Sequence, residues 1–252
     1  EWVAPNLYRM TAGKRVENTR DLCEEALERL DYFIKCLKDW GIYCSVDMTT
    51  YRRFKPGDGV KDAHLLHDGT RLYAMYDPTM IELQKEFCDQ FWNHYNPYTK
   101  LCHKDDPVFV MTEITNECDL FVNSPGKKAD YVDADYYINQ FRTLFRDWLK
   151  EQGIEYDWEN CDLYAQDEPL LKFKVYITKK YFREMYDHMR AIGVKIPITG
   201  TNWSRGAAGL AKCHEDLDFS DSHHYYYDWK WGNTERICAN TSITSSPIVF
   251  PN

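Results

Sequence analysis

Residues 106–117 read DPVFVMTEITNE, an apolar run that ends in an adjacent amide and carboxylic acid. An ionised Glu is costly to bury without a partner, so a buried strand rarely ends in Asn-Glu for packing reasons alone. At the carboxyl end of a parallel strand this cost disappears, because the active sites of α/β barrels open at that edge. The stretch therefore predicts a parallel strand whose last residues, Asn116 and Glu117, lie in an active site.

Helices and short apolar strands alternate on both sides of this stretch. Apolar periodicity predicts helices over residues 27–40, 78–95, 137–149 and 178–192, the last capped by Thr178 and closed by Gly193. Buried strands are predicted over residues 42–47, 106–117, 196–202 and 217–223. The alternation is typical of βαβ units in a right-handed parallel sheet. Because the sequence contains neither G-x-G-x-x-G nor G-x-S-x-G, it favours an α/β barrel over a nucleotide-binding open sheet or an α/β-hydrolase.

Length and charge limit the class of protein. The chain has 252 residues, enough for one large domain, and we expect residues 1–252 to form a single catalytic domain. The net charge of −9 and the lack of a basic cluster disfavour nucleic acid as a partner. No apolar run approaches the roughly 18 residues that span a membrane, so we expect no membrane partner. The oligomeric state is left open.

Cysteine and aromatic residues add two further constraints. The nine cysteines are odd in number and irregularly spaced, without C-x-x-C, which argues against a disulfide framework or a zinc ribbon. Free thiols in a reducing compartment are expected instead, so we expect a cytoplasmic protein. Aromatic residues make up 15% of the chain, with 19 Tyr and 8 Trp. Tyr and Trp line sugar sites because each offers an apolar face and a polar group, although they also fill cores.

Polar residues follow all four predicted strands, where the strand ends of a parallel sheet meet. They are Asp47, Asn116-Glu117, Asn202-Trp203 and residues 221–225. Strand alternation places Glu113 and Glu117 on one face and Asn116 on the other, so a bulge at the strand end is needed for both members of the pair to face the site.

Each of these residues also has a structural interpretation. Asp47 is as well suited to capping a helix or bracing a loop as to a role in the site, and Trp203 is as well suited to burying a loop. The structural interpretation of His223 is a hydrogen-bonded place in the core. Asp221, His223 and His224 are also a candidate metal set, because zinc sites use His and carboxylate with an open position. No H-x-H or H-E-x-x-H motif supports that alternative.

Taken together, these motifs resemble the clan A glycoside hydrolases, the cellulase-like (β/α)8 barrels. Residues 114–117 match the end of strand 4 in that family, and residues 221–225 match its strand-6 pattern of His, any residue, aromatic. The resemblance spans roughly residues 22–228. Further pieces that match one bacterial branch of cellulase-like proteins are residues 30–34, 41–43, 96–99, 105–107 and 113–117.

The resemblance implies roles for individual residues. Glu117 is implied as the general acid/base, and Asn116 as the residue that binds the sugar 2-hydroxyl. His223 and Tyr225 are implied to contact the sugar or orient the nucleophile. Asp47 and Trp203 are candidate substrate contacts, the latter as a stacking platform. The implied activity is retaining hydrolysis of β-linked oligo- or polysaccharide, without a cofactor or catalytic metal.

The chain departs from the family downstream. Family members carry a nucleophilic Glu at the end of strand 7, whereas the only acidic residue after Asp228 is Glu235, in a loop-like context. The readable strands correspond to strands 3–6, at about 45 residues per βα unit, so a complete barrel needs about 360 residues. We therefore expect a fragment of a longer barrel. The alternatives are an inactive barrel that binds glycans and a metal-dependent hydrolase.

Overall fold

The computed structural model describes residues 10–11, 14–15, 17–49, 52–66, 70–121, 124–125, 134–203 and 207–222. The α-helices are α2 (Glu24–Asp39), α3 (Thr70–Tyr73), α4 (Pro78–Trp92), α5 (Asp135–Gln152), α6 (Glu168–Ala191) and α7 (Ala207–Cys213). Three short 3-10 helices are η1 (Pro56–Asp58), η2 (Ala63–Leu65) and η3 (His103–Asp105). No helix among these residues is long and apolar enough to cross a membrane.

Three parallel strands form the main sheet, in the order β3 (Cys44–Thr49), β6 (Phe109–Thr115) and β7 (Ile198–Thr199). The register pairs Asp47 with Glu113, and Glu113 with Thr199. Two small antiparallel pairs, β1 (Met10–Thr11) with β2 (Lys14–Arg15) and β4 (Tyr95–Asn96) with β5 (Leu101–Cys102), lie outside this sheet. The prediction of an α/β fold with parallel strands is thus confirmed for this sheet.

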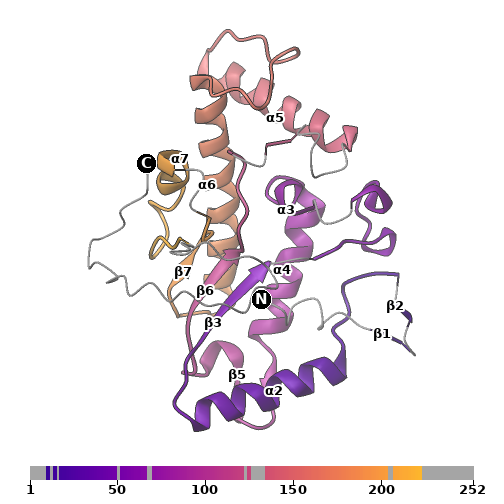
Figure 1. The fold of residues 1–252 in the computed structure, drawn as a ribbon, viewed down its shortest axis with the longest axis vertical. Helices are drawn as coiled ribbons and strands as arrows, with labels where there is room; N and C mark the ends of the chain where they lie inside the picture. The colour runs from indigo at the N-terminus through magenta and orange to yellow at the C-terminus, as the bar shows by residue number, and fades with distance from the viewer. Residues whose placement is uncertain are drawn as a thin grey trace, which may run out of the picture.

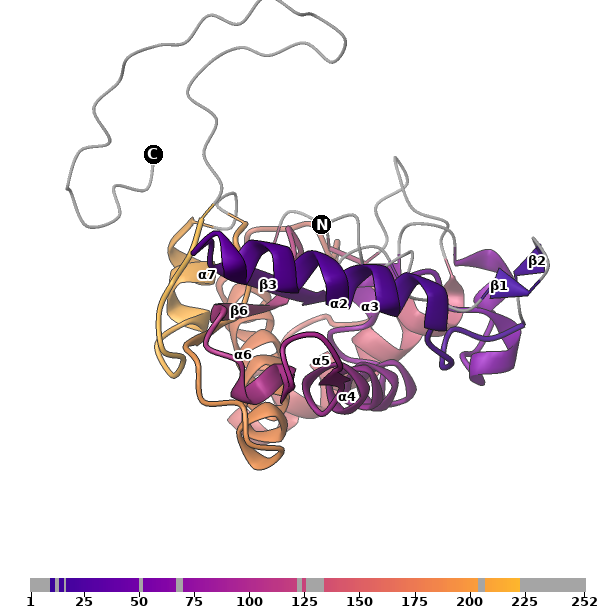
Figure 2. The ribbon, with the colours of Figure 1, turned by 90° about the horizontal axis from the view of Figure 1, so that it is seen from below.

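The two faces of the sheet differ. Helices α4 and α6 lie side by side against the strands (Figures 1 and 2), where Ile114 of β6 is fully buried. By strand alternation the opposite face carries Asp47 and Glu113, together with Ser45 and Met111, which are exposed. The polar second face thus brings the half-buried Asp47 and the buried Glu113 together on one side of the sheet.

Several predicted boundaries are confirmed for physical reasons that the sequence contains. The Asp77 carboxylate caps α4 by accepting a hydrogen bond from the backbone N–H of Met80 at 3.0 Å, and Pro78 occupies the first turn. Gly41, with φ +68°, lies directly after Trp40, the C-cap of α2. Gly193, with φ +97°, lies directly after Ile192, the C-cap of α6. A side chain at these φ values is strained, so glycine fixes where each helix stops.

The prediction that Thr178 caps a helix is wrong. Helix α6 begins at Glu168, ten residues earlier, with Asp167 as its N-cap and Pro169 in its first turn. Thr178 is buried in the middle of this helix. The segment from 168 to 177 is rich enough in helix-forming and apolar residues to extend α6 back past the threonine.

The last two predicted strands are also shorter than expected. Residues 196–202 contain only the two-residue β7, and residues 217–222 are not a strand, although they run beside β7. The backbone N–H of Ile198 donates to the Asp218 carboxylate at 2.7 Å, and Thr199 Oγ1 donates to the Phe219 carbonyl at 2.9 Å. One backbone bond joins the two segments, from the N–H of Asp218 to the Ile198 carbonyl at 3.2 Å, but the side-chain bonds replace further ladder bonds and no strand is formed.

A buried amide joins the sheet to both of its helices. Gln84 of α4 accepts hydrogen bonds at Oε1 from Thr49 Oγ1 at 3.1 Å and from Tyr181 Oη of α6 at 2.6 Å. Its Nε2 donates to the carbonyls of Ala74 and Met80. Because Gln84 is 2% exposed, each of these partners loses a bond that water cannot replace if the amide is removed.

We predict that Gln84→Met, which keeps the volume but not the hydrogen bonds, lowers the free energy of unfolding by about 3 kcal/mol. The control Tyr181→Phe removes one donor and leaves Gln84 bonded to Thr49, so a loss of about 1 kcal/mol is expected. Urea unfolding followed by circular dichroism measures both. Equal losses in the two variants would contradict the role given to the amide.

Candidate active site

Two carboxyl groups face each other across β3 and β6. Asp47 and Glu113 are paired in register, so their side chains lie on the same face of neighbouring strands. Glu113 is 3% exposed, whereas Asp47 is half-buried. Burial first, and then the negative charges of Asp47, Asp221 and Glu117, raise the pKa of Glu113 to about 11. Glu113 is therefore a neutral acid at physiological pH, and its proton is available to the Asp47 carboxylate.

Asn202, three residues after β7, connects the groups at the strand ends. Its Nδ2 donates to Glu113 Oε2 at 2.6 Å and to Asn116 Oδ1 at 2.8 Å. Its Oδ1 accepts from the backbone N–H of Glu117 at 2.8 Å. Asn202 is 1% exposed, so these hydrogen bonds are shielded from water. This one amide therefore fixes Glu113 in β6 and the two residues that follow the strand, Asn116 and Glu117.

The end of β6 turns sharply at Glu117. Its φ of +44° lies in the left-handed region, which is uncommon for a residue other than glycine. The turn takes the N–H groups of Glu117 and Cys118 out of the ladder, and Asn202 Oδ1 and Thr201 Oγ1 accept them, the latter at 3.3 Å. As a result Asn116 stays buried while Glu117 is half-exposed. Backbone strain of this kind clusters at functional sites.

A buried histidine supports the segment that carries Asn202. His214 Nδ1 lies 2.9 Å from the Leu210 carbonyl, and His214 Nε2 accepts the backbone N–H of Thr201 at 3.1 Å. Burial lowers the pKa of His214, which keeps the ring neutral and able to accept this bond. The histidine therefore fixes the residue next to Asn202.

The structure brings together three of the residues predicted from sequence. Asp47, Asn116 and Glu117 lie at the carboxyl edge of the sheet and are linked through Glu113 and Asn202. Trp203 follows Asn202 at the same edge and is half-buried. The exposed Asp221 lies near enough for its charge to raise the pKa of Glu113. His223, His224 and Tyr225 lie outside the described residues.

Sequence reasoning gave no role to Glu113, which has the most perturbed environment in this cluster. The signal was present, because Glu113 interrupts an apolar strand and shares a face with Glu117. Its environment depends on Asp47 lying opposite on the neighbouring strand. Predicting that contact requires knowledge of the register between two strands that are about 60 residues apart in sequence. Asn202 was singled out only as a polar residue after a strand.

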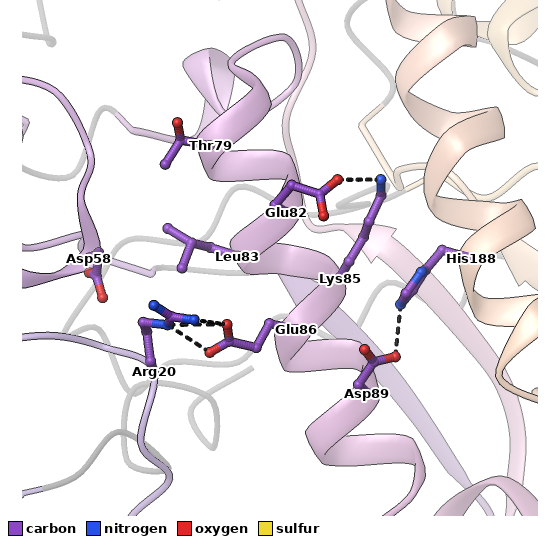
Figure 3. A pocket seen from close by; sticks show the side chains of 9 residues that line it. All are labelled: Arg20, Asp58, Thr79, Glu82, Leu83, Lys85, Glu86, Asp89 and His188. Carbon is purple, nitrogen blue, oxygen red and sulfur yellow. Dashed lines mark hydrogen bonds and ion pairs between the residues drawn. The ribbon is translucent and has the colours of Figure 1, made fainter.

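A surface pocket of about 600 Å³ lies elsewhere, along α4 (Figure 3). Three pairs form among its lining residues: Arg20 with Glu86, Lys85 with Glu82 and Asp89 with His188. Asp58, which also lines it, accepts hydrogen bonds from Thr19. None of the strand-end carboxyl groups lines it. Since these charged groups have partners, this pocket is better explained as a packing groove than as a reaction site.

No protein-family model and no curated protein matches the chain. Similar solved structures include an endo-1,4-β-mannanase from Rhizomucor miehei, with a TM-score of 0.48 and 16% identity over 79% of this chain and 48% of that one. An endo-β-1,4-mannanase from Thermotoga petrophila has a TM-score of 0.34 and 15% identity over 77% and 48% of the two chains. A glycoside hydrolase family 5 mannosidase from Rhizomucor miehei has a TM-score of 0.32 and 14% identity over 81% and 58%.

All three are glycosidases, the class whose motifs the sequence resembles. The chain spans about half the length of the first two. Because the TM-scores are low, the interpretation of the site rests on the residues of this chain alone.

We predict a pH-dependent stability that originates at Glu113. Between its usual pKa of 4.5 and the folded value of about 11, the folded chain keeps a proton that the unfolded chain releases. Stability from this group is therefore complete at low pH and declines as pH rises, by up to about 1.4 kcal/mol per pH unit. Glu113→Gln imitates the protonated acid, since its amide accepts from Asn202 and donates to Asp47, so this decline is expected to disappear.

Thermal unfolding from pH 6 to pH 9 measures the effect. The stability of Glu113→Gln relative to the unsubstituted chain is expected to increase steadily with pH. Glu155→Gln, a change at an exposed position, is the matched control and should follow the unsubstituted chain. A difference between Glu113→Gln and the unsubstituted chain that is constant across this range would show that Glu113 is not held protonated.

Proposed function

We propose that this chain carries the acid/base part of the active site of a retaining β-glycoside hydrolase, built as part of a (β/α)8 barrel. The observation that carries the proposal is Glu117. It is a half-exposed carboxyl group at the carboxyl edge of a parallel sheet, on a backbone fixed by Asn202 and next to a buried amide, Asn116. The motif resemblance of residues 114–117 supports the same role.

The arrangement of the sheet supports the barrel. The strands are parallel, helices cover one face, and the second face carries Ser45, Asp47, Met111 and Glu113. Barrel interiors take side chains from every second residue of each strand, and active sites lie at the carboxyl ends. The polar second face then corresponds to the interior, with Glu117 at its mouth.

In the proposed reaction Glu117 protonates the leaving glycosidic oxygen and later removes a proton from the incoming water. Asn116 binds the sugar 2-hydroxyl, and Asp47 and Trp203 contact the substrate, together with His223 and Tyr225. A carboxylate about 5–5.5 Å from Glu117 acts as the nucleophile in retaining enzymes. Glu113 does not fit that role, because it is buried and neutral. We assign it to positioning Asn202 instead. The reaction requires neither metal nor cofactor.

The second candidate is a catalytically inactive barrel that binds glycans. The sequence favours it, because the only acidic residue after Asp228 is Glu235, in a loop-like context that does not match a nucleophile at a strand end. An inactive protein still binds sugar through its aromatic and amide groups, so binding without turnover is its signature. Both candidates take a β-linked oligo- or polysaccharide, and the free thiols are consistent with our proposal of a cytoplasmic location.

The Glu117→Gln variant tests the acid/base role in the longest natural chain that contains these residues. Hydrolysis of β-linked gluco-, manno- and galacto-oligosaccharides, which have poor leaving groups, is expected to fall by about 10²–10⁴-fold, because general acid catalysis is lost. Aryl glycosides with strongly acidic leaving groups need no proton and should be cleaved at a rate closer to the original. Oligosaccharide binding, measured by calorimetry, should persist.

Glu155→Gln serves as the control for a change of charge at the surface. Undiminished hydrolysis of the oligosaccharides by Glu117→Gln would remove Glu117 from the acid/base role. Oligosaccharide binding by a protein that hydrolyses none of these substrates would favour the glycan-binding protein.

A further inference from the structure

A second cluster of ligand-type side chains lies at the opposite end of the sheet. It consists of Asp31 in α2, His94 between α4 and β4, and His103 at the start of η3. One ligand atom from each lies within 4.8 Å of the others. Figure 1 shows α2 and β5 at the end of the sheet away from the arrowheads of β3 and β6. His103 packs against Phe109, the first residue of β6, whereas Glu117 follows the last residue of that strand.

Both histidine side chains approach the Asp31 carboxylate. His94 Nε2 lies 2.7 Å from Asp31 Oδ2, and His103 Nε2 lies 3.4 Å from Asp31 Oδ1. The two imidazole rings are nearly perpendicular, with centroids 5.0 Å apart. Phe91 and Phe109 pack against the His103 ring, which places an apolar wall behind the cluster.

Burial leaves polar atoms of this cluster without hydrogen bonds. Asp31 and His103 are 2% and 1% exposed. Among the described residues, the buried atoms that lack a hydrogen-bond partner include Asp31 Oδ1 and both ring nitrogens of His103. The 3.4 Å contact between His103 Nε2 and Asp31 Oδ1 is thus not a hydrogen bond, and a buried polar group that makes no hydrogen bond is costly. A bound ion is one way to satisfy such groups. His103 Nε2 and Asp31 Oδ1 lie 3.4 Å apart, a separation that two ligands of one ion can take.

We propose that Asp31, His94 and His103 bind a divalent transition-metal ion, and that Zn²⁺ is the best match. Two imidazoles and one carboxylate are a common set of zinc ligands, and a water molecule completes a tetrahedral site. The partly exposed His94 lies on the surface side of the cluster and provides the route of entry. On binding, His94 Nε2 exchanges its contact with Asp31 for the metal, and any proton on a ligating nitrogen is released to solvent.

Such an ion would join α2 to the two ends of the β4–β5 hairpin, about 60 residues further along the chain. Helix α2 already contacts the β4–β5 hairpin through Asn96 Nδ2, which donates to the Asp31 carbonyl at 3.0 Å. The Lys38–Asp106 ion pair, at 2.8 Å, connects the other end of α2 to the segment before β6. A metal between them binds only the folded chain, so it stabilises this end of the sheet. This inference is independent of the proposed reaction.

The test is zinc binding by the metal-free chain, measured by calorimetry with ZnCl₂ and by elemental analysis after dialysis. One Zn²⁺ per chain is expected, with a higher melting temperature than in chelator. His94→Gln removes one ligand but can still donate to Asp31, and binding is expected to weaken by more than the ~10–100-fold that loss of an outer-shell partner costs. His188→Gln is the matched control, because His188 pairs with Asp89 at 2.8 Å at similar exposure and belongs to no such cluster among the described residues.

Cobalt substitution gives a second readout that needs no variant. Co²⁺ held by nitrogen and oxygen ligands gives visible ligand-field bands without the near-ultraviolet thiolate charge-transfer band. A thiolate charge-transfer band would show that cysteines hold the metal and would overturn the assignment. Failure of the unsubstituted chain to bind Zn²⁺, or equal binding by His94→Gln and the unsubstituted chain, would also overturn it.

Discussion

The amide of Asn202 is the interaction on which the carboxyl edge of the sheet depends. Beyond the last residue of β6 the ladder can no longer satisfy the backbone, and the N–H of Glu117 would be left without a partner. Asn202 accepts that N–H and uses its own two donors for Glu113 and Asn116. Because the amide is both donor and acceptor, no residue type with only one of these functions can replace it. The sharp turn at Glu117 is possible because this side chain replaces the lost ladder bonds.

The charge of the cluster follows from the same contact. Four carboxyl groups, Asp47, Glu113, Glu117 and Asp221, influence one another, and all four cannot be ionised cheaply in a partly buried space. Burial selects Glu113 as the group that keeps its proton, since it is the least exposed of the four. A neutral Glu113 can accept from Asn202 at one oxygen while its proton is directed to Asp47. Deprotonation would place a buried negative charge beside Asp47, so the geometry at Glu117 is coupled to the protonation of a residue four positions earlier.

Local chemistry explains which features were predictable from sequence. The Asp77 cap, the glycines at positions 41 and 193, and the apolar run of β6 each act within a few residues, and they were identified correctly. Thr178 was misassigned because a threonine that is typical of a cap also fits the buried face of a long helix. The absence of a strand over residues 217–222 could not be predicted, because it depends on contacts of Asp218 and Phe219 with β7, 20 residues away. The same reason applies to Asp31, His94 and His103, whose spacing of 63 and 9 residues forms no local motif.

The two polar clusters lie at opposite ends of the sheet, and the two ends have different structural requirements. At the carboxyl ends of parallel strands the loops are free to carry functional groups, and ligands bind there in α/β folds. At this end Glu117 lies on a strained turn, and the four carboxyl groups differ widely in exposure. At the amino ends the chain enters the strands from α2 and η3, and loose packing there would shift the register of β3 against β6. A slip by one residue would turn Asp47 and Glu113 to opposite faces. Contacts at the amino ends, such as the Lys38–Asp106 ion pair, therefore help to preserve the geometry at the carboxyl ends.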